Sequence, residues 1–317
     1  MTDPAMAVAM ATVRSDAQER ERSRGSAAHA PASVISSSPV SASSPSSSAP
    51  TPAAPVAIIG TGAMGGAILR GLLAHGIAPG DLIGVDAAPA RQAELTALGV
   101  RTMTAEEAAS TARTIVVAVK PYAVTALLDS IASSLRKDAL VVSVAAGIST
   151  TILEEHLADA AVVRVMPNTP ARVGEGMAAI TPGLNVTEEQ TASVVALFET
   201  IGRAAVVPES LQDSVTAISG SGPAYLLLVV ESMIDAGVLL GVPRPLATEL
   251  AVQTITGTAA LLRETGEHPA LLRESVTSPG GSTAAALRQL EDHRLKAAFT
   301  DAMEACAKRN AELGDVG

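Results

Sequence analysis

The feature that most constrains the fold is a glycine-rich turn between an apolar strand and a helix. Its members are Gly60, Thr61, Gly62, Ala63, Met64 and Gly65, a complete G-x-G-x-x-G. The turn follows the apolar run Val56–Ile59 and opens a predicted helix over Met64–Ala74. Gly60 permits a tight turn, Gly62 lets backbone amides approach a pyrophosphate, and Gly65 lets the helix pack close to the strand. A structural turn in an Ala/Gly-rich chain is the alternative, but this position in a βαβ unit favours dinucleotide binding.

Apolar runs and helical patterns alternate from this turn to about residue 166. Strands are expected at Val56–Ile59, Leu82–Asp86, Thr114–Val119, Leu140–Val144 and Val162–Met166, and helices at Met64–Ala74, Arg91–Leu98, Val124–Ser134 and Ile152–Leu157. Alternation of this kind predicts a parallel sheet with helical crossovers. Unbroken Val/Ile runs fit strands that are buried on both faces.

The strand pattern stops after about Ser210. Helices are expected over Pro223–Leu240, Pro245–Arg263, Ala270–Ser275, Thr283–Glu291 and Leu295–Leu313. Gly and Pro residues separate them. The predicted fold is therefore α/β, with a Rossmann-type dinucleotide-binding domain over residues 55–210 and an all-helical domain over residues 211–317.

The first 54 residues have a different composition. They are rich in Ser, Pro and Ala, and they carry four Arg and four acidic residues. A segment with so little apolar surface is expected to be disordered. The whole net charge of −10 then belongs to residues 55–317.

Composition excludes several classes of protein. The negative charge would repel phosphate backbones and anionic membranes, and an aromatic content of 1% argues against base stacking. Cys306 is the single cysteine, so no internal disulfide or cysteine-cluster metal site is expected.

The most apolar run, Ala224–Val242, is interrupted by Glu231 and Asp235, which favours a buried helix in a core or a subunit interface over a membrane span. Without a signal peptide pattern either, the sequence predicts a cytoplasmic protein with no nucleic-acid or membrane partner.

Asp86 bears on which cofactor is used. It ends the second predicted strand, where an acid hydrogen-bonds the adenosine ribose 2′-hydroxyl and repels a 2′-phosphate. Arg91, five residues later, could instead serve a 2′-phosphate. A solvated Asp at a strand end is the third possibility. The cofactor is expected to be NADPH or NADH, with Asp86 mildly favouring NADH.

The ends of the next two strands are expected to line the same cleft. They carry Ala118, Val119, Lys120 and Pro121, and then Ala145, Ala146 and Gly147. In an open α/β sheet, ligands bind outside the carboxyl ends of the strands. For Lys120, an exposed surface lysine is the alternative.

Two loops in the helical part are candidates for the substrate site. Ser219–Tyr225 enters the long apolar helix with Pro223 at a helix start. Ser278–Thr283 precedes the predicted helix Thr283–Glu291, and free amides at a helix start can hold a carboxylate. Either loop alone would more simply be an ordinary capped helix start.

At this point the residues resemble the pyrroline-5-carboxylate reductase family, over nearly all of the chain from Val56 onwards. The shared motifs are Ile59–Gly65, Ala118–Pro121, Ala145–Gly147, Arg164–Pro170, Ser219–Tyr225, Gly266–Pro269 and Val276–Thr283. The resemblance implies reduction of L-1-pyrroline-5-carboxylate to L-proline, the last step of proline biosynthesis, by NADPH or NADH. It also implies a helical domain that pairs with a partner copy, with dimers commonly associating into decamers.

The resemblance also implies roles for individual residues. The substrate is expected on Ser278, Gly280, Gly281, Ser282 and Thr283, with its carboxylate on the Gly-Gly loop. Thr283 is expected to hydrogen-bond the ring nitrogen and to be the catalytic residue. Asn168, Ser221 and Gly222 join the expected cofactor contacts, and no metal is expected. The chain departs from the family pattern in its Ser/Pro/Ala tail and at Asp86–Ala88, which puts the usual NADPH preference in doubt.

Two other functions fit parts of the sequence. A β-hydroxyacid dehydrogenase has a similar layout but uses a lysine just after its cofactor domain, and residues 211–295 contain no lysine. A nicotinamide sensor would need Gly60–Gly65 but not Ser278–Thr283. Oxidation of the cofactor with and without pyrroline-5-carboxylate discriminates among these functions.

Overall fold

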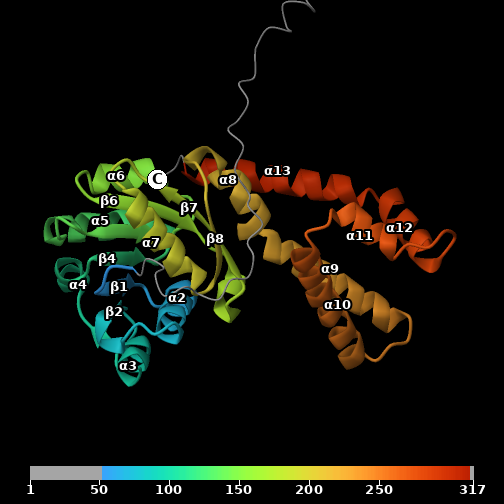
Figure 1. The fold of residues 1–317 in the computed structure, drawn as a ribbon, viewed down its shortest axis with the longest axis horizontal. Coiled ribbons are helices and arrows are strands. Elements are labelled where there is room, and N and C mark those ends of the chain that lie inside the picture. The colour runs from blue at the N-terminus through green and yellow to red at the C-terminus, as the bar shows by residue number, and fades with distance from the viewer. Residues whose placement is uncertain (1–51, 315–317) are drawn as a thin grey trace, which may run out of the picture. The chain divides into compact units, whose positions relative to one another are not determined.

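The computed structural model describes residues 52–314, and Figure 1 shows their arrangement as a sheet flanked by helices. The strands are β1 (Val56–Ile59), β2 (Leu82–Val85), β3 (Arg101–Thr102), β4 (Thr114–Val117), β5 (Leu140–Ser143), β6 (Ala161–Met166), β7 (Gly176–Pro182) and β8 (Gly202–Val206). The helices among them are α2 (Ala63–Ala74), α3 (Pro89–Ala97), α4 (Ala105–Thr111), α5 (Val124–Ile131), α6 (Thr150–His156) and α7 (Glu188–Glu199). The tail predicted to be disordered lies, apart from Pro52–Ala54, outside the described residues.

The eight strands form one sheet in the order β3-β2-β1-β4-β5-β6-β7-β8. The expected parallel pairing is confirmed from β1 to β6, but β7 runs antiparallel to β6. Only a short 3-10 turn, η4 (Thr169–Val173), separates these two strands. A parallel connection needs a dozen or more residues, so the chain turns back instead. The sequence analysis did not identify β3, β7, β8, α4 or α7.

Both faces of the sheet are covered by apolar helices. One core contains the Ile68 and Leu72 side chains of α2 together with Phe198 of α7, and Phe198 is fully buried. The opposite core contains Val124 and Leu128 of α5 and smaller side chains of α4. This double burial explains why the central strands are continuous runs of Val and Ile. It also leaves the carboxyl ends of the strands as the open edge where a ligand can bind.

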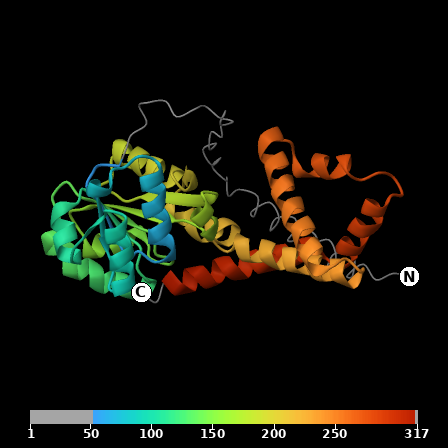
Figure 2. The ribbon, with the colours of Figure 1, turned by 90° about the horizontal axis from the view of Figure 1, so that it is seen from below.

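Helices alone follow residue 209, as the sequence predicts. They are α8 (Gln212–Val215), the π turn η6 (Thr216–Gly220), α9 (Gly222–Leu239), α10 (Arg244–Thr265), α11 (Pro269–Ser275), α12 (Ser282–Asp292) and α13 (Leu295–Gly314). Helix α13 returns beside α8 and η6, as Figure 2 shows. The expected Rossmann-type sheet followed by an all-helical region is confirmed.

The long helix α9 is apolar but exposed. Leu226, Leu227 and Leu228 are each more than half exposed. The continuous stretch Glu209–Leu239 is long and apolar enough to cross a membrane by length and composition, and 6% of its most apolar window is buried. Glu231 and Asp235 lie within it. Of the two places expected for this helix, the core of its own chain is not the one observed. A subunit interface stays a prediction.

Candidate active site

The glycine-rich turn is packed tightly on one side and open on the other. Gly60 has φ +90°, and a Cβ there would lie 2.7 Å from the Ala118 carbonyl oxygen. At Gly65 a Cβ would lie 2.0 Å from the Gly60 carbonyl oxygen. At Gly62, by contrast, a Cβ would meet no atom within 4 Å. Helix α2 begins directly after Gly62 without a side-chain cap, which leaves its first amides available to an anion.

Asp86 is joined to this turn by hydrogen bonds. Thr61 donates to its Oδ2 from both the backbone N and Oγ1, each at 2.8 Å, and the Ala88 N donates to Oδ1 at 3.0 Å. Partial burial alone would raise the pKa of Asp86, but these hydrogen bonds and the nearby Arg91 charge outweigh it and lower the pKa. Asp86 is therefore a fixed negative charge beside the dinucleotide turn. The sequence placed Asp86 here but gave no sign of the bonds from Thr61.

Arg91, the sequence-based alternative for a 2′-phosphate, already has an ionic partner. Its Nη1 lies 2.7 Å from Glu94 Oε2, one turn along α3. Both side chains are exposed, so this pair is weak and can be exchanged for another anion.

The other residues predicted on the nucleotide side follow β4 and β5. Ala118 borders the turn at Gly60, Lys120 is exposed, and Pro121 begins a 3-10 turn. The Val144 N donates to the Val117 carbonyl oxygen at 3.0 Å, so the ends of β4 and β5 are neighbours. Of the residues that follow β5, Ala145 is buried, Ala146 is exposed and Gly147 has φ +77°. The structure thus brings the ends of β1, β2, β4 and β5 together at one edge.

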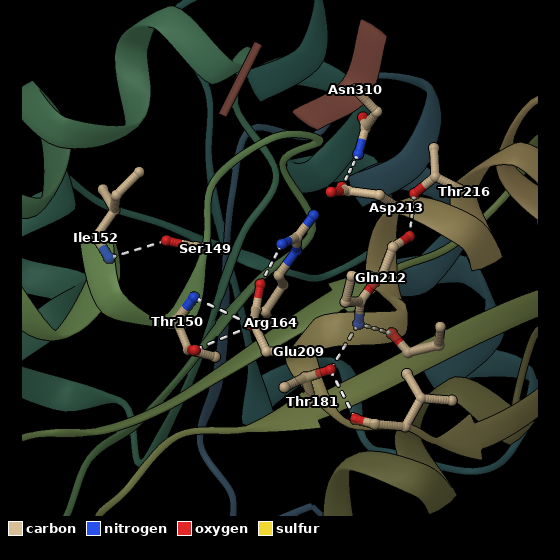
Figure 3. A network of polar contacts seen from close by, with 12 residues as sticks. Ser149, Thr150, Ile152, Arg164, Thr181, Glu209, Gln212, Asp213, Thr216 and Asn310 are labelled. Atoms are coloured by element: carbon tan, nitrogen blue, oxygen red, sulfur yellow. Dashed lines mark hydrogen bonds and ion pairs between the residues drawn. The ribbon is translucent and has the colours of Figure 1, made fainter. Parts of the chain in front are cut away.

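A buried polar network lies next to this edge (Figure 3). Arg164 of β6, with 6% of its side chain exposed, is ion-paired through Nη1 with Glu209 Oε1. Glu209 Oε2 also accepts a hydrogen bond from Thr150 Oγ1 at 3.0 Å, at the start of α6. Within residues 52–314, the Nε and Nη2 atoms of Arg164 are buried without a hydrogen-bond partner, and Glu209 forms the ion pair with this side chain. Nothing in the sequence pattern identified this network.

The turn from η6 into α9 holds Ser221 and Gly222, both half-buried. Ser221 Oγ lies 3.2 Å from Cys306 Sγ of α13. The Tyr225 ring packs edge to face on Phe299, with centroids 6.5 Å apart. Burial, followed by the Cys306 contact, raises the pKa of Tyr225. The Tyr225 ring therefore packs on α13 at the start of α9.

The predicted substrate loop reaches α12 through a bend at Gly280, which has φ +69°. Gly281 is the N-cap of α12, and no side chain caps this helix. A Cβ on Gly281 would lie 2.4 Å from Ser278 Oγ, so the loop folds closely on itself. Ser282 is exposed and Thr283 is half-buried in the first turn of α12. Across residues 52–314, no hydrogen bond or ion pair joins this loop to the dinucleotide turn.

An apolar groove of about 720 Å³ separates α9 from α12 and α13. Its walls include Leu228, Val229 and Met233 of α9, Leu290 of α12 and Phe299 of α13. Such a groove needs an apolar cover rather than a polar ligand. No cluster of three or more His, Cys, Asp or Glu residues with metal-binding geometry occurs within the described part of the chain.

Comparisons with known proteins assign both halves of the chain. Residues 55–147 match the family described as NADP oxidoreductase, coenzyme F420-dependent, and residues 209–313 match the family described as pyrroline-5-carboxylate reductase dimerisation. The chain is 44% identical to a pyrroline-5-carboxylate reductase of Synechocystis, over 66% of this chain and 78% of that protein. It is also 44% identical to a pyrroline-5-carboxylate reductase of Escherichia coli, over 66% of this chain and 78% of that protein.

Solved structures agree with the sequence comparisons. A pyrroline carboxylate reductase of Plasmodium falciparum with NADP bound superposes with a TM-score of 0.76 and 32% identity, covering 83% of this chain and 99% of that one. A pyrroline-5-carboxylate reductase of Coxiella burnetii gives 0.78 at 32% identity, covering 82% and 98%. The dinucleotide turn, the uncapped helix start at Gly281 and these likenesses lead to one conclusion: the chain belongs to the pyrroline-5-carboxylate reductase family.

Proposed function

We propose that this protein reduces L-1-pyrroline-5-carboxylate to L-proline with a reduced nicotinamide dinucleotide, as the last step of cytoplasmic proline biosynthesis. The observation that carries the proposal is the presence of two helix starts without a side-chain cap, each after a glycine-rich turn, in one chain of this family. One follows the dinucleotide turn at Gly62 and the other follows Gly281. A cyclic iminium is already electrophilic, so the main demand on the protein is to hold two reactants face to face.

The residues at the strand ends fit a dinucleotide. The open space beside Gly62 and the uncapped amides of α2 would hold the pyrophosphate. Asp86, fixed by Thr61, would accept from the adenosine ribose hydroxyls. A bound dinucleotide supplies the hydride. Ala118–Pro121, Ala145–Gly147, Ser221 and Gly222 are proposed to border the remainder of the cofactor.

The start of α12 would bind the substrate. Its free amides and the hydroxyl groups of Ser278 and Ser282 would hold the carboxylate. Thr283, in the first helical turn, would orient the ring nitrogen through Oγ1 and stabilise its charge. No general acid is required for hydride transfer, because the iminium nitrogen already carries the proton that the product amine keeps, and the step removes no proton that would need a general base.

We expect Thr283→Ala to lower kcat by about 10- to 100-fold, because an oriented hydrogen bond to a charged group is worth about 1.5–3 kcal/mol. Thr283→Ser, which keeps the hydroxyl, should retain most of the activity. Steady-state kinetics with both variants test this, with circular dichroism to verify the fold. Wild-type kinetics in Thr283→Ala would remove this residue from the mechanism.

We propose a preference for NADH over NADPH. A 2′-phosphate would meet the fixed charge of Asp86, and like charges in close contact cost several kcal/mol. Asp86→Asn removes the charge but keeps one oxygen acceptor, and it should shift the NADPH-to-NADH ratio of kcat/KM upward by about tenfold or more. The lowered pKa means that Asp86 stays ionised at neutral pH, and a 2′-phosphate, whose second pKa is about 6, is ionised above neutrality as well. The preference should therefore not change between about pH 7 and pH 8.

Glu94→Gln serves as the matched variant for this test. It frees Arg91 from its ion pair without touching Asp86. A gain in NADPH use in Glu94→Gln alone, with no effect of Asp86→Asn, would show that Arg91 sets the preference.

We further propose that two copies pair through the apolar faces of α9 and α10 and the groove that Leu228 and Phe299 line. The match of residues 209–313 to a dimerisation family and the exposed leucines of α9 support this pairing. Dimers are proposed to associate further, up to decamers. Light scattering after size-exclusion chromatography measures the assembly, and a monomer at micromolar concentration would contradict it.

The first experiment is a spectrophotometric assay at about 340 nm with L-1-pyrroline-5-carboxylate and either NADH or NADPH. Oxidation that depends on the imine establishes the reaction. Cofactor binding without oxidation would instead support a nicotinamide sensor.

A further inference from the structure

We propose that Asn168 is a positioning residue that fixes the Ser219–Gly222 turn for hydride transfer, rather than a ligand of the cofactor. Asn168 lies after β6, and the turn lies 51 residues later at the junction of η6 and α9. This proposal rests on the proposed function. Asn168 would affect hydride transfer through the backbone of the turn and not by touching the cofactor.

Both ends of the Asn168 amide are engaged by the protein. Its Nδ2 donates to the Ser219 carbonyl oxygen at 3.0 Å, and its Oδ1 accepts from the Met177 N at 2.9 Å. Asn168 also occupies the N-cap position of η4, where an Asn commonly caps the helix, but its side chain makes no capping bond there. Its side chain therefore bridges β7 and the turn instead of stabilising its own segment.

The chain itself explains why the Ser219 carbonyl needs an external donor. In an α-helix this oxygen would accept from the N–H four residues later. That residue is Pro223, which has no N–H. The half-buried Ser219 carbonyl would otherwise lack this bond, and Asn168 supplies it across the fold.

The local backbone indicates a functional turn. Ser221 N donates to the Thr216 carbonyl oxygen at 2.9 Å, five residues back, which defines a π turn. Such turns occur mostly as single turns within helices, and frequently at functional sites. The segment before Asn168 supports the same turn, because a Cβ on Gly220 would lie 2.8 Å from Met166 Cε. Met166, at the end of β6, and Asn168, two residues later, thus pack against successive residues of the turn, Gly220 and Ser219.

The experiment compares Asn168→Ala, Pro223→Ala and the double variant. Asn168→Ala should lower kcat by about 10- to 100-fold, because small displacements of reacting groups carry penalties of this size. The Kd for NADH, measured by nucleotide fluorescence, should rise in Asn168→Ala, because Ser221 and Gly222 of the displaced turn are proposed to border the cofactor, and it should return to within about twofold of the wild type in the double variant. In the double variant, the alanine that replaces Pro223 has an N–H that can donate to the Ser219 carbonyl, so kcat should recover at least about fivefold over Asn168→Ala. Asn185→Asp, an exposed asparagine change elsewhere, is the control and should leave kcat unchanged.

Amide hydrogen exchange of residues 216–225 gives a readout that does not depend on turnover. Exchange should rise in Asn168→Ala and fall again in the double variant. A weaker Kd for NADH in Asn168→Ala that the double variant does not restore would overturn the proposal in favour of a direct cofactor contact. Unchanged kcat and exchange, or a loss of kcat that Pro223→Ala does not restore, would also overturn it. If the wild type binds NADH but does not turn over, the proposed function fails, and the exchange data alone still decide whether Asn168 holds the turn.

Discussion

Replacing Gly65 with alanine is expected to weaken dinucleotide binding by more than about a hundredfold. The added Cβ would lie 2.0 Å from the Gly60 carbonyl oxygen and 3.1 Å from Ala118 Cβ. The nearest of these atoms is backbone, so the turn itself must move. Overpacking of this kind costs about 3 kcal/mol, and the turn relaxes away from its binding geometry to escape it. Regaining that geometry for the dinucleotide requires the same free energy, which corresponds to about a hundredfold in affinity. Fluorescence titration with NADH and NADPH measures the effect.

Two further glycine variants make this test specific. Gly62→Ala should leave the thermal midpoint unchanged, because its Cβ would meet no protein atom within 4 Å, but it should weaken binding by projecting toward the pyrophosphate. Gly80→Ala, in a 3-10 turn with equally open space, should alter neither property. Wild-type affinity in Gly65→Ala would contradict the assignment of this turn.

The second large effect is expected from Glu209→Gln, which should destabilise the fold by about 3 kcal/mol. Removing one member of a buried ion pair leaves the other charge uncompensated, at a cost of about 3–5 kcal/mol. The lower end of this 3–5 kcal/mol range (about 3 kcal/mol) applies because the pair is only partly buried. About a third of the Glu209 side chain is exposed, compared with 6% of the Arg164 side chain. Equilibrium denaturation in urea measures the change, on the assumption of two-state unfolding.

The exposed pair Arg136 and Asp138 provides the matched control. Asp138→Asn removes one member of an ion pair in which both side chains are more than a third exposed. Its denaturation midpoint should equal that of the wild type. Equal midpoints for Glu209→Gln and the wild type would mean that water reaches Arg164 and that the pair does not stabilise the fold.

Much of the nucleotide-binding half could be predicted from sequence because its signals are local. The glycine spacing from Gly60 to Gly65 depends on adjacent backbone, and the strand of Asp86 follows it within one βαβ unit. The prediction of the parallel strands β1, β2, β4, β5 and β6 is confirmed for the same reason, whereas the two-residue strand β3 was not predicted. The antiparallel strand β7 escaped prediction because its direction depends on the length of a turn that carries no strong periodic signal.

The roles assigned to Thr283, Ser278 and Lys120 remain predictions. Geometry supports an anion site at the start of α12 and an open edge at the ends of the strands. The motifs predict cofactor contacts for Thr61 and Asn168, but in the structure both side chains bond to other parts of the protein. Thr61 bonds to Asp86, and Asn168 bonds to Ser219 and Met177.

The sequence by itself therefore determined the class of fold, the dinucleotide turn and the family, because each depends on short-range patterns of glycine, apolar and loop residues. Only the tertiary structure decided that Arg164 depends on Glu209, that Asp86 is fixed by Thr61, and that Asn168 supplies the donor that Pro223 lacks. These contacts join residues 25 to 51 positions apart. A hydrogen bond between a side chain and a distant backbone group produces no periodic sequence pattern from which the pair could be predicted. Such partners come together only when the chain folds.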